Sequence, residues 1–69
     1  MKLEVEKIVA TATYPQGTTI TDVIVDMCDK SGFNTIYDDG DEVVMRNGQY
    51  LAFVNIDASN IVHTTFYRN

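Results

Sequence analysis

A chain of 69 residues with a net charge of −5 forms at most one domain, here residues 1–69, and a domain of this size buries only about 60% of the surface that its unfolded form exposes. Its single cysteine excludes a disulfide framework within the chain, and that cysteine with the single histidine falls short of the four ligands of a structural zinc site. We therefore expect no metal and no cofactor, and a partner subunit is the remaining way to support so small a fold.

The chain begins with a stretch rich in β-branched residues, 2–14, that predicts a strand. Leu3 and Val5 occupy odd positions before Glu6 and Lys7, whereas Ile8, Ala10, Ala12 and Tyr14 occupy even positions after them. This phase change predicts a bulge, or a strand whose two halves bury opposite faces. In the turn that follows, we expect Pro15 at the first central position and Gly17 with a positive φ.

One amphipathic helix is predicted over residues 18–32. The apolar residues there have the i, i+3, i+4, i+7, i+8 spacing of one helix face: Ile20, Val23, Ile24, Met27 and Cys28. Thr19 followed by Asp22 resembles a capping box, and Gly32 occupies the position of a left-handed C-cap. Because Cys28 belongs to the apolar stripe, we expect it to be buried and structural, and its replacement by Ala to leave a destabilising cavity.

Four short strands are predicted after the helix, over residues 33–37, 42–46, 49–57 and 61–68. The dipeptides Asp39-Gly40 and Asn47-Gly48 favour tight hairpins, so these strands form an antiparallel meander. With the N-terminal strand the order is β-α-β-β-β-β. The expected class is α+β, with an antiparallel meander sheet and one amphipathic helix packed on one face.

The central hairpin predicts which residues share a face of the sheet. A two-residue turn at Asn47-Gly48 pairs Met45 with Tyr50. One face then carries Val43, Met45, Tyr50, Ala52, Val54 and Ile56, and the other carries Val44, Leu51 and Phe53. Both faces are apolar and one helix covers only one of them, although the pattern leaves open which one. Val44, Leu51 and Phe53 are therefore candidates for a homodimer interface, with edge-strand pairing as the alternative.

The negative charge is concentrated in residues 22–42. This segment contains seven acidic residues and one lysine. The charged residues in the rest of the chain are three acidic and four basic ones. Direct nucleic-acid binding is disfavoured, because contacts to phosphates require clustered Lys and Arg. The expected partner is a larger protein, and the candidate residues for binding it are Asp22, Asp26, Asp29, Asp38, Asp39, Asp41 and Glu42.

Three of these carboxylates, Asp22, Asp26 and Asp29, fall on one side of the predicted helix, away from the apolar stripe. They are spaced by roughly one helical turn, about 5.4 Å, which is comparable to the spacing of successive phosphates. A protein surface that normally grips nucleic acid could accept such a row. The alternative interpretation is an ordinary solvated helix face.

The stretch YDDGDE, residues 37–42, has three interpretations. A hairpin turn is favoured, and an acidic patch for partner binding is compatible with it. A calcium loop is disfavoured, because the spacing of its carboxylates differs from that of an EF-hand and a strand follows directly. We expect Gly40 to be required for the turn, and the carboxylates to contribute charge rather than structure.

Catalytic motifs are not recognisable, so the chain is not expected to be an enzyme. Cys28 and His63 could form a thiol–base pair, but Cys28 lies well past the helix N-terminus, where a helix dipole would activate a thiol. His63 is expected to be a structural or surface residue. Neither a P-loop nor a dinucleotide-binding fingerprint is present.

The N-terminal residues carry charges where a signal peptide would be apolar, and no apolar run approaches the roughly 20 residues of a membrane helix. A single unpaired cysteine suits a reducing compartment. We therefore expect a cytoplasmic protein that does not associate with membranes.

In size, charge and compactness the chain resembles the small acidic single-domain proteins that bacteriophages make to block host enzymes or defence systems. The resemblance rests on these general properties and includes no motif. It implies a protein-binding inhibitor that occludes a functional, basic surface of a larger protein. Two alternatives remain: a structural or assembly subunit that acts through homo-oligomerisation, and a small-molecule binder with a site at a dimer interface.

Overall fold

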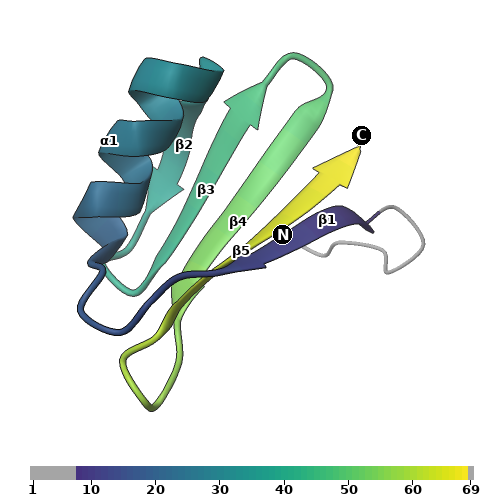
Figure 1. The fold of residues 1–69 in the computed structure, drawn as a ribbon. Helices are drawn as coiled ribbons and strands as arrows, with labels where there is room; N and C mark the ends of the chain where they lie inside the picture. The colour runs from purple at the N-terminus through teal and green to yellow at the C-terminus, as the bar shows by residue number, and fades with distance from the viewer. Residues whose placement is uncertain (1–7, 69) are drawn as a thin grey trace.

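The computed structural model describes residues 8–68, which form one helix and a five-stranded antiparallel sheet (Figure 1). The elements are β1 (Ile8–Thr13), α1 (Ile20–Ser31), β2 (Asn34–Asp38), β3 (Glu42–Asn47), β4 (Tyr50–Ile56) and β5 (Val62–Arg68). The strands are ordered β1-β5-β4-β3-β2, so the last four form a meander and β1 adds to β5. The α+β class is confirmed. The bulge predicted at Glu6 and Lys7 lies outside the described residues, and the register of β1 instead shifts between Ile8 and Ala10.

Both ends of α1 form as the sequence predicts. The Thr19 hydroxyl accepts a hydrogen bond from the backbone N–H of Asp22 at 3.1 Å, and the Asp22 carboxylate accepts one from the N–H of Thr19 at 3.2 Å. This capping box satisfies two backbone donors that the first helical turn leaves without partners. At the other end Gly32 adopts φ 69°, a left-handed conformation in which a residue with a Cβ would be strained.

The core lies between α1 and one face of the sheet. Val23 and Met27 from the helix pack with side chains of the three central strands: Val43, Met45, Ala52, Val54 and Val62. Phe33, just after the helix, is buried and holds its ring centroid 5.9 Å from that of Phe66. Phe66 therefore faces the helix side and Tyr67 faces the other side.

The expectation that Cys28 is buried is wrong, because its side chain is exposed. Successive residues of a helix are rotated by about 100°, so Met27 and its neighbour Cys28 cannot both point at the centre of a narrow contact. Val23 and Met27 define that centre, and Ile20 and Ile24 are only partly buried beside it. Cys28 falls beyond the edge of the stripe that the small sheet can cover.

The register predicted for the β3–β4 hairpin is also wrong. Met45 pairs with Ala52 rather than with Tyr50, and Tyr50 pairs with Asn47, so the two-residue turn is Gly48-Gln49. The Asn47 side-chain amide donates a 2.7 Å hydrogen bond to the Ser31 carbonyl at the end of α1, which accounts for its place in the strand. The register differs from the predicted one by two residues, and an even shift leaves every side chain on its predicted face.

A smaller correction concerns the turn before the helix. The N–H of Thr18 donates to the Pro15 carbonyl at 3.1 Å, so Pro15 is the first residue of the turn rather than its first central residue. Gly17 has the predicted positive φ, 96°. The turn thereby leads the chain from β1 into the N-terminus of α1.

One polar group in the core lacks a partner. Thr64 on β5 is fully buried, and its hydroxyl makes no hydrogen bond within the described residues. We expect Thr64→Val, which replaces the hydroxyl with a methyl group of similar size, to raise the free energy of unfolding by about 1 kcal/mol. Urea denaturation will measure it, with Thr65→Val on the opposite face of the same strand as the control. A loss of stability in Thr64→Val would show that the hydroxyl has a partner, such as a buried water.

Candidate protein-binding surface

The β2–β3 loop is organised by its own carboxylates. One oxygen of Asp39 accepts hydrogen bonds from the N–H groups of Asp41 at 3.1 Å and Glu42 at 2.9 Å, and Asp38 accepts one from the N–H of Gly40 at 2.9 Å. The second Asp39 oxygen accepts a 3.2 Å bond from the Tyr37 hydroxyl, which raises the pKa of that phenol. The hairpin-turn interpretation is confirmed, and Gly40 has φ 96°. The expectation that all four carboxylates contribute only charge is wrong for Asp38 and Asp39.

We expect Asp39→Ala to destabilise the fold by about 1 kcal/mol, because it removes the acceptor of two backbone N–H groups and of the Tyr37 hydroxyl. Asp41→Ala is the matched control, since it removes an equal charge whose side chain caps neither backbone group. Asp39→Asn keeps an acceptor oxygen and should lie closer to the parent protein. Thermal unfolding followed by circular dichroism will rank the variants, and equal melting temperatures for Asp39→Ala and Asp41→Ala would contradict this account.

The three acidic residues of α1 have different surroundings. Asp22 belongs to the capping box, and Asp26 forms an exposed 2.9 Å ion pair with Lys30 one turn later. Hydrogen bonding to the Asp26 carboxylate, and its negative charge, raise the pKa of Lys30. The only lysine of residues 22–42 is thus engaged within the helix. Asp29 is exposed, so its carboxylate is accessible from solution.

The start of α1 and the acidic loop meet at one end of the molecule (Figure 1). Thr19 and Ile20 on one side and Gly40 and Asp41 on the other line the same open hollow of about 500 Å³. Asp22, in the first helical turn, therefore lies at the same end as the loop carboxylates. Asp29 follows Asp22 by seven residues, about 10 Å along the helix axis. The loop carboxylates thus lie at the N-terminal end of the helix that carries Asp22, Asp26 and Asp29.

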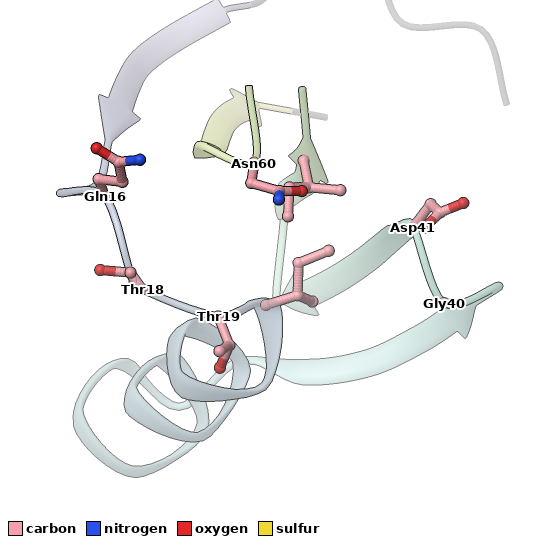
Figure 2. A pocket seen from close by; sticks show the side chains of 9 residues that line it. Gln16, Thr18, Thr19, Gly40, Asp41 and Asn60 are labelled. Atoms are coloured by element: carbon pink, nitrogen blue, oxygen red, sulfur yellow. The ribbon is translucent and has the colours of Figure 1, made fainter. Parts of the chain in front are cut away.

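The hollow at this end is lined by few side chains that could catalyse a reaction or bind a charged ligand (Figure 2). Its nine lining residues are Gln16, Gly17, Thr18, Thr19, Ile20, Gly40, Asp41, Ile56 and Asn60. Asp41 is the only charged residue among them, and Figure 2 shows its carboxylate pointing away from the centre. The Thr19 hydroxyl is already used in the capping box. What remains is the Thr18 hydroxyl, two side-chain amides and two isoleucines, which can contact a ligand but include no acid or base that would activate that hydroxyl.

A second, apolar hollow lies on the sheet face away from α1. It measures about 230 Å³ and is lined by Ile36, Tyr37, Glu42, Val44 and Phe53. Val44 pairs with Phe53 on one side and with Tyr37 on the other, so these three side chains share a face. Among residues 8–68, α1 is the only helix and it packs on the opposite face. No described element covers this hollow.

The three residues predicted as an oligomer interface contribute to this face unequally. Val44 is only 3% exposed and Leu51 only 9% exposed. Phe53 is half-buried and lines the apolar hollow together with Val44. Leu51 pairs with Arg46 and Tyr67 and does not line it. The larger exposed apolar surfaces at the hollow are those of Ile36 and Tyr37, which the sequence analysis did not single out.

A hydrogen-bonded chain through His63 was also missed. One His63 nitrogen, Nε2, lies 2.7 Å from an Asp57 oxygen, and the other, Nδ1, lies 3.2 Å from the Thr13 hydroxyl. The order carboxylate–imidazole–hydroxyl is the one that activates a hydroxyl nucleophile in hydrolases. None of these residues lines either hollow, however, and Asp57 also accepts hydrogen bonds from the N–H groups of Ser59 and Ile61. The chain of contacts thus ties β1 and the β4–β5 turn to β5.

Other predicted chemistry can be assessed within residues 8–68. His63 pairs with Thr13 on the sheet face away from α1, whereas Cys28 is on α1, so the sheet separates the imidazole from the thiol. No group of three or more His, Cys, Asp or Glu side chains in this part of the chain is placed to hold a metal ion. Over the same range, no helix has both the length and the apolar character needed to cross a membrane.

Comparison with protein-family models, with curated proteins and with solved structures finds no match to this chain. The function must therefore be inferred from the chain's own surface.

Proposed function

We propose that this protein is a binding module that acts as an inhibitor, by placing its acidic surface on a functional, basic surface of a larger protein. The observation that carries the proposal is the arrangement of the segment 22–42. Its carboxylates lie on α1 and at the β2–β3 turn, and six of the seven residues are exposed. The single lysine among them is paired with Asp26. Such a surface accelerates encounter with a basic partner and discriminates against acidic ones.

The two alternatives draw less support from the described residues. A subunit that assembles through Val44, Leu51 and Phe53 would use two side chains that the chain already buries. A small-molecule binder could use the hollow of about 500 Å³ at the start of α1, whose size suits such ligands. Yet that hollow is open and lacks a charged group directed into it. The acidic surface is the feature that specifies the chemistry of a partner, namely a basic protein surface.

The test is capture of a partner by a charge-neutralised variant and by the parent protein. In the variant all seven acidic residues of segment 22–42 become Asn or Gln, which keeps acceptor oxygens for the capping box and the β2–β3 loop. Immobilised parent protein should retain a stoichiometric partner from a lysate of the source cells at low salt and release it at high salt. The variant should associate more slowly, with a weaker dependence on salt.

A second variant, Glu4→Gln with Glu6→Gln, removes negative charge outside the segment and should behave like the parent. Addition of the parent protein should reduce the activity of the captured partner in proportion to the amount bound. Equal capture by the neutralised variant and the parent would overturn the proposal and move the binding surface to the sheet.

A further inference from the structure

We propose that the apolar hollow beside the acidic β2–β3 loop is the docking site for a cationic peptide segment of the partner, with one apolar side chain of that segment inserted in the hollow. The inference rests on the proposed function, because it specifies where and by which side chains the partner is held. Four observations support it: the origin of the hollow, its size, its charge and the form of the strand edge beside it.

The hollow is built by a bulge in the edge strand β2. Thr35 pairs with Met45 and Tyr37 pairs with Val44, so Ile36 between them has no partner of its own. A bulge of this kind sets two residues against one and redirects their side chains. Ile36 and Tyr37 consequently both line the hollow over Val44, although they are adjacent in sequence. They remain 51% and 52% exposed, so they border an accessible apolar site.

The size of the hollow selects the kind of occupant. Its volume of about 230 Å³ lies below the roughly 300–1,000 Å³ of sites that enclose small-molecule ligands. It is large enough for one branched or aromatic side chain. Anchoring by a single apolar side chain in a pocket is common at protein interfaces, where few residues supply most of the binding energy.

The negative charge around the hollow favours basic residues next to the inserted side chain of the partner. Glu42 lines the hollow and is half-buried. Tyr37 also lines the hollow, and its hydroxyl donates a hydrogen bond to the Asp39 carboxylate in the loop. No Lys, Arg or His of residues 8–68 forms an ion pair with Asp39, Asp41 or Glu42. A half-buried carboxylate beside apolar groups gains from an incoming cation, because partial desolvation strengthens the attraction. Lys or Arg next to the inserted side chain would supply that cation.

The same features disfavour two other occupants. A bulged edge interrupts the regular ladder of backbone groups, so β2 is poorly suited to pair with an added strand. A second copy of the chain docking hollow to hollow would bring two acidic loops together, and like charges at an interface are unfavourable. The geometry therefore favours insertion of a side chain from a basic segment.

Two synthetic peptides test the proposal: a lysine-rich peptide with one central phenylalanine, and the same peptide with alanine in its place. We expect the phenylalanine peptide to bind about tenfold more tightly or better, the range given by burial of one aromatic side chain. In the ¹⁵N-labelled protein it should shift the amide signals of Ile36, Tyr37, Val44 and Phe53. Ile36→Ala with Tyr37→Ala should abolish the difference between the peptides, and Ile36→Ala alone should reduce it.

Val25→Ala is the matched control, because Val25 is an equally exposed apolar residue, 52%, on α1. Its preference for the phenylalanine peptide should be unchanged. Equal, salt-sensitive binding of both peptides would overturn the hollow as a docking site and leave the proposed function standing. If neither peptide binds at low salt, the hollow is not a docking site for a basic segment. The proposed function would then still be tested separately by the partner-capture experiment. A homodimer in sedimentation that Ile36→Ala with Tyr37→Ala dissociates would identify a second copy as the occupant.

Discussion

Met45→Ala should unfold much of the protein under conditions in which the parent is stable. Met45 is fully buried in the centre of β3, where it packs with Ala52 opposite and with the side chains of α1 above. Truncation of a buried methionine to alanine costs about 2–5 kcal/mol, through lost transfer free energy and the cavity left behind. Small domains have only about 5–15 kcal/mol in total, so this single change removes a large fraction of the stability. Urea denaturation followed by circular dichroism will measure it.

Cys28→Ala is the control for Met45→Ala. Both changes truncate a sulfur-containing side chain, but Cys28 is exposed. Surface substitutions of this kind usually change stability by less than about 0.5 kcal/mol. A stability loss for Cys28→Ala that approaches the loss for Met45→Ala would mean that the thiol is covered, contrary to the structure.

The parts of the fold that the sequence predicts well are those specified by neighbouring residues. The Thr19–Asp22 capping box and Gly32 define α1 from within a few positions of the chain, and the helix ends where they indicate. Alternation of apolar residues likewise assigns Val43 and Met45 to one face and Val44 to the other. The limits of the four strands after the helix follow from the same local signals to within one residue, whereas the predicted start of the first strand lies outside the described residues.

The parts that the sequence could not predict depend on contacts between distant residues. The hairpin register differs from the prediction, and Asn47 is bonded to Ser31, sixteen residues earlier. Whether Cys28 is buried or exposed depends on how wide a face of α1 the sheet can cover, which the local sequence does not indicate. Thr13 and His63 are fifty residues apart, and nothing local in either segment indicates that they meet.

The candidate site shows the same division. Its charge was visible as a concentration of carboxylates in residues 22–42. Its apolar part was not, because the bulge at Ile36 aligns two consecutive residues on one face and breaks the alternation on which the sequence analysis relies. A register irregularity in an edge strand becomes visible only when the pairing partners are known.

Removal of the Asp57 side chain should weaken the closure of the β4–β5 turn and reduce its dependence on pH. One Asp57 oxygen accepts hydrogen bonds from the N–H groups of Ser59 at 2.8 Å and Ile61 at 3.0 Å, and the other contacts His63 at 2.7 Å. The hydrogen bond from His63, followed by those from the backbone, lowers the pKa of the Asp57 carboxyl below its ordinary value. A carboxyl with a lowered folded-state pKa stabilises the protein above the ordinary value, and this contribution is lost as the pH falls through the lowered one.

We therefore expect Asp57→Ala to lower the melting temperature by several degrees at neutral pH. The difference in melting temperature between Asp57→Ala and the parent should shrink as the pH falls from the ordinary carboxyl pKa through the lowered pKa of Asp57. Asp57→Asn separates the two roles of the carboxylate. It keeps an oxygen for the N–H groups of Ser59 and Ile61 but loses the charge next to His63, so it should recover part of the neutral-pH loss while showing the weaker pH dependence of Asp57→Ala. Thermal unfolding of the three proteins across this range decides the matter. A constant difference between Asp57→Ala and the parent at every pH would show that the charge of Asp57 contributes nothing, and that its hydrogen bonds alone hold the turn.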